Sequence, residues 1–188
     1  METTTLLPPM VDAPGLELRA WEPGDVDALA DAVTRNLEHL RPWMAWIAHE
    51  PLSRAARLEL IERWALEREA GGDVVYGVLR DGEVLGGTGL HRRPGPHGLE
   101  IGYWVDGDHT GRGIATEVAR ALTTAALALD GIHFVEIHHD RANVVSGRVP
   151  RRLGFTLVGE APSEVTSPGQ EGVDCTWRVH ADAWRGGP

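Results

Sequence analysis

The sequence predicts an α+β fold, in which strands and helices are partly segregated along the chain. The order of the patterns is strand, helices, three strands, helix, strand, helix, strand and strand, which matches neither a doubly wound sheet nor a sandwich. A strand pattern over residues 98–105 leads through a glycine-containing turn into a long helical pattern. Asp81-Gly82, between two strand-like runs, is a strong signal for a hairpin.

The stretch from Gly98 to Leu129 is the centre of the predicted fold. Its first residues alternate between apolar and other side chains, with the period of two that is typical of a strand. Glu100 and Trp104 therefore share one face of this strand. After the turn, apolar residues recur every three or four positions, which predicts an amphipathic helix that packs on the sheet. The alternating apolar residues of the strand are Leu99, Ile101, Tyr103 and Val105.

The turn between this strand and this helix predicts an anion site. Gly111 and Gly113 lack a Cβ atom, so the chain can turn tightly there and a ligand can approach the main chain. Such a turn directs free backbone N–H groups and the positive end of a helix dipole at one point, where proteins commonly bind phosphates. Arg112 adds a positive charge. An ordinary strand-to-helix turn is the alternative interpretation, because short glycine patterns are weak signals.

Two familiar phosphate motifs match this turn poorly. A P-loop needs Lys and then Ser or Thr after its last glycine, whereas Ile114 and Ala115 follow Gly113. A dinucleotide fingerprint would have Thr116 in place of its third glycine, and its acidic residue could only be Glu136, inside a strand pattern. The turn therefore favours neither motif.

The first half of the chain predicts a tail and several short elements. Residues 1–14 are polar and then interrupted by prolines, which predicts a loosely held tail. Asp25 and Ser53 are candidate N-caps of two helices, and Pro42 breaks a helical spacing between them. The elements predicted here are a strand at 16–20, a helix after Asp25, a broken helical segment at 37–47, a helix from Ser53 to Ala70, and strands at 74–79 and 83–90.

Glycines and apolar runs mark the elements on either side of the central stretch. Gly86, Gly87 and Gly89 are unusual inside a strand and predict a bulge or the close approach of another group. A strand that follows a strand and a crossover helix runs parallel to the first, so residues 133–138 should be the parallel neighbour of the central strand. Gly154 is typical of the position just after a helix end. A helix starting near Asn143 and strands at 155–159 and 173–179 complete the prediction.

Composition and charge restrict the function classes. The 188 residues are enough for one domain, 1–188, with a full core. A single cysteine, Cys175, excludes an internal disulfide, and no pattern of His, Cys and acidic residues has metal-ligand spacing, so no metal is predicted. The net charge of −10 argues against a nucleic-acid-binding surface. Without a membrane-length apolar run or a signal-peptide pattern, the sequence predicts a cytoplasmic protein with no membrane contact.

The run from Ile101 to Thr116, together with Asn143, Ser146 and residues 153–155, resembles the acyl-CoA-binding core of the GCN5-related N-acetyltransferase (GNAT) superfamily. Within it, the chain is most similar to the branch of the RimJ and RimL ribosomal-protein N-terminal acetyltransferases. The pyrophosphate motif of the superfamily is met at Gly113 and Ala115, whereas Thr110 departs from its first position. The resemblance implies a GNAT fold: a mixed sheet of about six or seven strands with a V-shaped splay and helices on both faces.

The resemblance also implies acetyl-CoA as the co-substrate. The diphosphate would be held by backbone N–H groups of the turn, and the pantetheine arm would enter between the splayed strands. Asn143 could bond the pantetheine amides or simply cap its helix. The cofactor-binding residues implied in this way are Tyr103, Trp104, Val105, Thr110, Gly111, Arg112, Gly113, Ile114, Ala115, Thr116, Asn143 and Ser146.

The implied reaction is direct attack of a primary amine on the thioester in a ternary complex, which needs a base, donors to the carbonyl oxygen, and a proton for the thiolate. Glu100 is the first candidate base, although it could instead pair with Arg92 or Arg93. Glu164 is the second candidate, and His138 and His139 could also serve. Ser146 could return a proton to the thiolate, or satisfy local N–H groups at a helix start.

The acceptor side is less determined. Trp43 and Trp46 are candidate substrate-binding residues, and each is equally well explained as a core residue. The acceptor would be a protein N-terminus or a small-molecule amine, the acyl group could be larger, as in succinyl-CoA, and a homodimer is left open. Two other classes stay open: a non-catalytic acyl-CoA-binding protein or sensor, and a dinucleotide-dependent enzyme.

Overall fold

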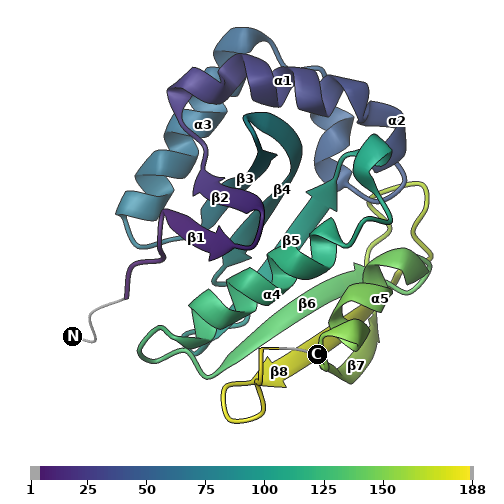
Figure 1. Ribbon diagram of the computed structural model, residues 1–188. Coiled ribbons are helices and arrows are strands. Elements are labelled where there is room, and N and C mark those ends of the chain that lie inside the picture. The colour runs from purple at the N-terminus through teal and green to yellow at the C-terminus, as the bar shows by residue number, and fades with distance from the viewer. Residues whose placement is uncertain (1–4, 187–188) are drawn as a thin grey trace.

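A computed structural model describes residues 5–186. Its strands are β1 (Met10–Ala13), β2 (Leu16–Ala20), β3 (Val74–Arg80), β4 (Glu83–His91), β5 (Gly98–Val105), β6 (Phe134–Asp140), β7 (Thr156–Pro162) and β8 (Val173–His180). Its helices are α1 (Val26–Arg35), α2 (Leu37–Leu40), α3 (Arg54–Glu69), α4 (Ile114–Leu127) and α5 (Val144–Arg152), with short 3₁₀ turns at Pro23–Asp25, Ala45–His49 and Gly107–His109. The strands form one sheet in the order β1-β2-β3-β4-β5-β6-β8-β7 (Figure 1).

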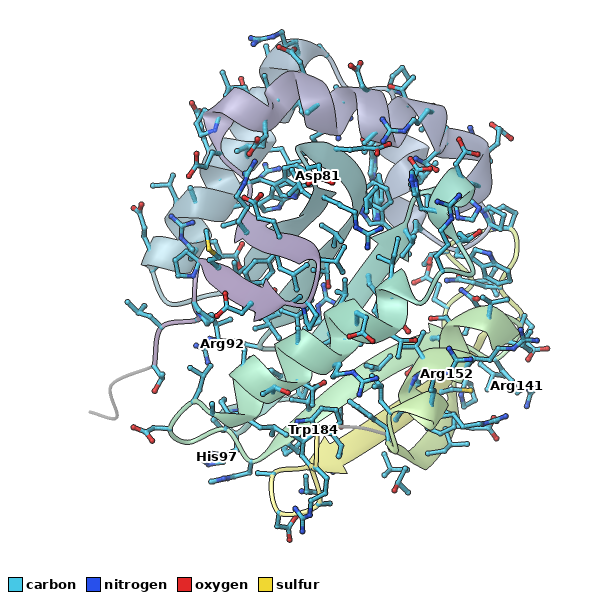
Figure 2. The ribbon with its side chains drawn as sticks, viewed as in Figure 1. Asp81, Arg92, His97, Arg141, Arg152 and Trp184 are labelled. Atoms are coloured by element: carbon cyan, nitrogen blue, oxygen red, sulfur yellow. The ribbon has the colours of Figure 1, made fainter. Side chains whose placement is uncertain are left out.

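Helices cover both faces of this sheet, as predicted. In β3, Val74, Tyr76 and Val78 face the core under α4 and α5, whereas Val75 between them faces a second core under α1 and α3. α4 crosses the middle of the sheet and packs on β5 and β1 (Figure 1). After β8 the chain returns to α4, where the Trp184 indole N–H donates to Thr124 Oγ1 at 3.1 Å (Figure 2). The α+β prediction is therefore confirmed, with eight strands in place of six or seven.

The prediction of a loosely held tail over residues 1–14 is wrong for most of residues 5–14, the part that the structure describes. Met10–Ala13 form β1, which pairs antiparallel with β2. Leu7 and Val11 are buried in the core, and the Tyr76 hydroxyl donates to Pro8 O at 2.7 Å. A four-residue strand after two prolines is too short to show a clear period of two, which explains the error. Residues 1–4 lie outside the described residues.

Most other helices and strands lie where local sequence signals, such as capping residues and glycines, predicted them. Ser53 caps α3, because its Oγ accepts the Ala56 N–H at 3.2 Å. Asp25 stands at the N-cap position of α1, but its carboxylate accepts from the Arg19 guanidinium and the Glu22 N–H instead. Gly154 has the left-handed φ of +81° that ends α5.

The two central strands separate part-way along their length. β5 and β6 are the parallel pair, and they are paired only from Gly98 to Ile101 on β5 and from Phe134 to Ile137 on β6. Beyond this point β6 continues along β8 to Asp140, whereas residues 102–105 of β5 keep only β4 as a neighbour. The predicted V-shaped splay is therefore present and begins at Gly102.

Candidate active site

A cavity of about 820 Å³ passes through this splay. One face of β5 contributes Glu100, Gly102 and Trp104 to its lining, and the other face contributes Tyr103. Because residues from both faces line one cavity, the cavity reaches from the α1 and α3 side of the sheet through the gap to α5. Other lining side chains come from the tryptophan-rich segment before α3, from β6 and from the start of α5: Trp43, Trp46, His138, His139, Asn143 and Ser146.

The turn after β5 presents unpaired backbone donors. Gly111 and Gly113 have φ values of +73° and +81°, which only glycine adopts readily, and α4 begins after Gly113. The Glu117 N–H donates to Gly113 O at 3.0 Å and is the first amide bonded within this helix end. Within the described part of the chain, the amides of residues 111–116 make no hydrogen bond to protein. The turn thus has the free N–H groups and helix dipole of an anion site.

A buried carboxylate fixes the position of this turn. Asp106 is 2% exposed and accepts from Arg35 Nε at 2.7 Å and Asn36 Nδ2 at 2.8 Å. Burial alone would raise its pKa, but the hydrogen bonds from Asn36, Arg35 and the Asp108 N–H outweigh burial and hold the pKa at about 2. Asn36 Oδ1 also accepts the Gly107 N–H at 2.8 Å. The end of α1 therefore anchors the turn, a contact across about 70 residues that no local signal indicates.

Three glycines, Gly87, Gly89 and Gly102, form a bay on the sheet where the splay begins, and neighbouring rings cover two of them. In the register of β4 and β5, Gly89 lies opposite Gly102, with the pair His91 and Glu100 on one side and Gly87 opposite Trp104 on the other. A Cβ atom on Gly87 would lie 2.5 Å from Trp104 Nε1, and one on Gly89 would lie 2.6 Å from His91 Nε2. These rings therefore lean over the glycines, which confirms the predicted close approach.

Comparison with known proteins shows the family to which the chain belongs. The model of the acetyltransferase (GNAT) domain matches residues 15–156, which include the splay, the glycine turn and the start of α5.

The chain belongs to the GNAT acetyltransferase family.

Two curated relatives carry names that refer to the acetylation of ribosomal proteins. The Bacillus subtilis protein YdaF, named for ribosomal N-acetyltransferase activity, is 29% identical over 147 residues, which span 78% of this chain and 80% of the relative. The ribosomal-protein-serine acetyltransferase of Escherichia coli is 25% identical over 145 residues, with 77% and 80% covered. The structure of RimL, a ribosomal L7/L12 alpha-N-protein acetyltransferase in complex with coenzyme A, shares the fold with a TM-score of 0.81 at 24% identity, covering 95% of this chain and 99% of that one.

These findings confirm the predicted GNAT resemblance and the predicted reaction class, and the curated relatives are named as ribosomal-protein acetyltransferases, as the RimJ and RimL resemblance implied. The GNAT protein is an acetyl-CoA-dependent N-acetyltransferase, and the dinucleotide and non-catalytic interpretations are set aside. Within residues 5–186 no group of three or more His, Cys, Asp and Glu side chains could hold a metal ion. In the same residues no helix has the length and apolar character needed to cross a membrane.

Glu100 of this acetyltransferase lines the cavity and is also ion-paired. Its Oε1 accepts from Arg93 Nη1 at 2.6 Å, and its side chain is 14% exposed. The other arginine considered as a partner, Arg92, donates instead to Gly71 O and Thr5 O and points toward the N-terminal segment (Figure 2). Glu100 is therefore both a carboxylate of the cavity and the ion-pair partner of Arg93.

The two histidines of β6 cannot act as the base, so that prediction is wrong. His138 Nδ1 donates to Asp174 Oδ2 at 2.8 Å and its Nε2 donates to Glu136 Oε2 at 2.9 Å. The hydrogen bond to Asp174 outweighs burial and, with Glu136, raises the pKa of His138 to about 9, so the ring is a cation at neutral pH. In His139, Nδ1 donates to Asp140 O and Nε2 accepts the Trp177 indole N–H at 3.0 Å, which occupies both nitrogens.

Two hydroxyl groups meet across the splay. The Tyr103 hydroxyl donates to Ser146 O at 3.1 Å and lies 3.3 Å from Ser146 Oγ. Burial raises the pKa of Tyr103 to about 12, so the phenol keeps its proton. Asn143 Oδ1 accepts the Ser146 N–H at 3.2 Å, which is the capping role that the sequence left open, while Asn143 also lines the cavity.

The remaining candidates divide between the cavity and the surface. Trp43 and Trp46 line the cavity, and the Trp46 ring centroid lies 6.4 Å from that of Trp104. Glu164 is exposed in the loop between β7 and β8 and does not line the cavity, so as a second base it is wrongly placed, while Gln170 of the same loop does line it. Val105 is also outside the lining. Thr110 donates its hydroxyl to Gly107 O, and Arg112 donates to Asp108 O, so both brace the turn.

Proposed function

We propose that this enzyme acetylates the free α-amino group of a protein or peptide N-terminus. The observation that carries the proposal is the cavity that passes through the β5 and β6 splay, because a thioester arm and an amine can approach each other from opposite faces of the sheet there. The names of the relatives, which specify ribosomal N-acetylation, support this acceptor class.

Acetyl-CoA binding is assigned to the turn and the splay. The free amides of residues 111–116 would donate to the diphosphate oxygens, with the dipole of α4 adding a favourable field. The pantetheine arm would take the place of a neighbouring strand along residues 102–105, which have no β6 partner. Backbone N–H groups of this segment that face the gap are available to polarise the thioester carbonyl.

The amine would enter from the face that carries Glu100 and the tryptophans. An ammonium group is attracted to the Glu100 carboxylate and to the faces of Trp46 and Trp104, whose rings stand beside the bay. On the opposite face, the paired hydroxyl groups of Tyr103 and Ser146 stand where a leaving thiolate could receive a proton. The chain thus supplies separate groups for the amine and for the thiol.

A thiol-release assay tests the proposal. Purified protein is mixed with acetyl-CoA and a short peptide that has a free N-terminal serine, and the same peptide with a blocked N-terminus serves as the control. We expect turnover with the free peptide only, and a fall of about 100-fold in kcat/KM for Glu100→Gln, because the ammonium loses the carboxylate that positions it. Glu59→Gln, an exposed carboxylate on α3, is the matched variant and should keep full activity.

Other outcomes would redirect or refute the proposal. Turnover with a polyamine or an aminoglycoside but not with the peptide would contradict the acceptor class. Turnover with succinyl-CoA in preference to acetyl-CoA would contradict the acyl donor. Cytoplasmic location, a single domain over residues 1–188 and a homodimer stay predictions.

A further inference from the structure

A second carboxylate–histidine pair borders the bay, on the side away from β6. His91, the last residue of β4, lies 2.7 Å from Asp73 Oδ2 through its Nδ1, and Asp73 Oδ1 accepts the Arg92 N–H at 2.8 Å. Because a carboxylate can only accept here, the His91 proton is on Nδ1. His91 Nε2 then carries a lone pair, and it has no hydrogen-bond partner among residues 5–186.

The free nitrogen of His91 lies beside the point where the splay opens. An ideal Cβ atom on Gly89 would be 2.6 Å from His91 Nε2, and one on Gly102 would be 3.7 Å from it. Gly102 is the first residue of β5 beyond its pairing with β6. The His91 side chain is 15% exposed and lines the cavity, and Glu100 is its direct neighbour across the β4 and β5 ladder.

Among the cavity-lining histidines of β4 and β6, only His91 has a ring nitrogen without a hydrogen-bond partner in residues 5–186, while His49 lines the cavity from the separate 3₁₀ turn before α3. One oxygen of Glu100 is already bound by the Arg93 guanidinium. His138 and His139 have both ring nitrogens occupied. Asp73 contacts His91 directly, Arg92 follows it in the chain, and Glu100 is its partner in the strand register. The other charged or titratable side chains that line the same cavity are His49, Glu50, Arg57, Arg63, Arg93, Tyr103, His138, His139, Asp140 and Asp174.

We propose that His91, oriented by Asp73, removes the proton from the acceptor ammonium, while Glu100 attracts and positions that ammonium. The inference rests on the proposed function and specifies one of its steps. The ammonium gives one proton to His91 Nε2, and the resulting amine attacks the thioester carbon. As the C–S bond breaks, a second proton leaves the amine nitrogen and the thiolate gains one, through the Tyr103 and Ser146 hydroxyls or water. His91 then releases its proton to solvent, and an amide and free coenzyme A thiol result.

The dependence of kcat/KM on pH tests the role of His91. With acetyl-CoA and the free N-terminal serine peptide, the wild-type kcat/KM should rise with pH to a plateau, because a general base acts in its unprotonated form. His91→Gln should lose this rise and about 100-fold or more in kcat/KM, the usual contribution of a general base. His133→Gln changes an exposed histidine outside the cavity and should keep both rate and profile.

Two further measurements separate loss of the base from loss of structure. The thermal shift on adding acetyl-CoA should be the same for His91→Gln and wild type, because His91 lies on the acceptor face of the sheet. Asp73→Asn should lower kcat/KM by less than His91→Gln does. On the high-pH plateau, nitrogen-15 spectra of the histidine rings should show the His91 proton on Nδ1 in the wild type and a mixture of tautomers in Asp73→Asn.

Three results would overturn the inference. The first is a His91→Gln enzyme that keeps the wild-type rate and profile while Glu100→Gln loses both, which would leave the proposed function intact with Glu100 as the base. The second is a wild-type His91 protonated on Nε2. The third is a wild-type protein that acetylates none of the amines, which would refute the proposed function and this step together.

Discussion

The two flanks of Glu100 carry the same residue types in different arrangements. On the β4 side, His91 has one carboxylate partner, Asp73, and a free Nε2 over the bay. On the β6 side, His138 lies between two carboxylates, Asp174 and Glu136, and both of its nitrogens are occupied. Asp73 fixes the proton of His91 on Nδ1 and leaves Nε2 without a partner, whereas Asp174 and Glu136 bind both nitrogens of His138. The first arrangement is suited to proton transfer and the second to structure.

The β6 flank is balanced as a buried charge network. Glu136 is 4% exposed and accepts from Arg178 Nε at 2.8 Å as well as from His138. A buried carboxylate is costly unless cations and donors surround it, so the positive charge of His138 has a structural explanation. The Glu136 and Glu100 Cα atoms are partners in the parallel ladder, which brings this network next to the active-site carboxylate.

The largest expected effect comes from filling the bay between the two flanks. Gly102→Val would place methyl groups beside His91 Nε2, in the space that the proposal gives to the amine and the thioester. We expect kcat/KM to fall by about 100-fold, because a small displacement of reacting groups has effects of this size. Gly159→Val on β7, where a Cβ atom meets nothing within 4 Å, is the matched control. Normal activity in Gly102→Val would show that the reaction occurs elsewhere.

The second expected effect is on stability and concerns the β6 flank. Glu136→Gln removes the carboxylate shared by His138 and Arg178 and leaves two cations close together. We expect a loss of about 2 kcal/mol in the free energy of unfolding, below the loss for a fully buried pair because Arg178 is partly exposed. Urea denaturation measures it. A loss below about 0.5 kcal/mol, the range of neutral surface changes, would contradict the structural role.

Sequence patterns predicted the scaffold of the site better than its chemistry. The period of β5, the glycine turn and the stripe of α4 are local features, so the splay region and the anion turn could be placed in advance. The partners of the histidines are not local. Asp174 reaches His138 from β8, and Asp73 lies 18 residues before His91, so only the strand register shows which ring is free.

Two specific errors have the same origin. The predicted strand ended at residue 90, and His91 was not among the base candidates, because its place opposite Glu100 depends on the pairing of β4 with β5. Glu164 was expected near the thioester, but the excursion between β7 and β8 turns Gln170 inward and leaves Glu164 exposed. Residue types alone do not show which side chains of a loop or strand end face the cavity. That depends on how the neighbouring strands pair.

The third effect is a pH dependence of stability on the β6 flank. The folded-state pKa of His138, raised to about 9, lies above its ordinary value of 6.5. The stabilisation is therefore fully present below about pH 6.5 and is lost as the pH rises through about 9. His138→Gln should be less stable than wild type by about 1 to 2 kcal/mol at pH 6, after allowance for solvent screening, and the difference should shrink by pH 9.5. A difference that is constant with pH would contradict a charged His138.

The smallest expected effect distinguishes His91 from Glu100 as the group whose loss of a proton sets the pH dependence of the reaction. Arg93→Gln frees Glu100 from its ion pair, and the Arg93 side chain is 61% exposed, so the energetic change is small. We expect less than about a threefold change in kcat/KM and an acidic limb at the same pH, because Arg93 is paired with Glu100 and the partner of His91 is Asp73. If the limb moves upward, Glu100 is the group that titrates, since removing a nearby cation makes a carboxylate harder to ionise.

A crystal structure with a non-hydrolysable acetyl-CoA analogue tests the central claim most directly. We expect the diphosphate oxygens to lie about 3 Å from the backbone nitrogens of residues 111–116, and the acyl carbon to lie in the splay beside Gly102, within reach of an amine held between His91 and Glu100. A diphosphate bound away from this turn, or an acyl group that does not enter the gap between β5 and β6, would contradict the account.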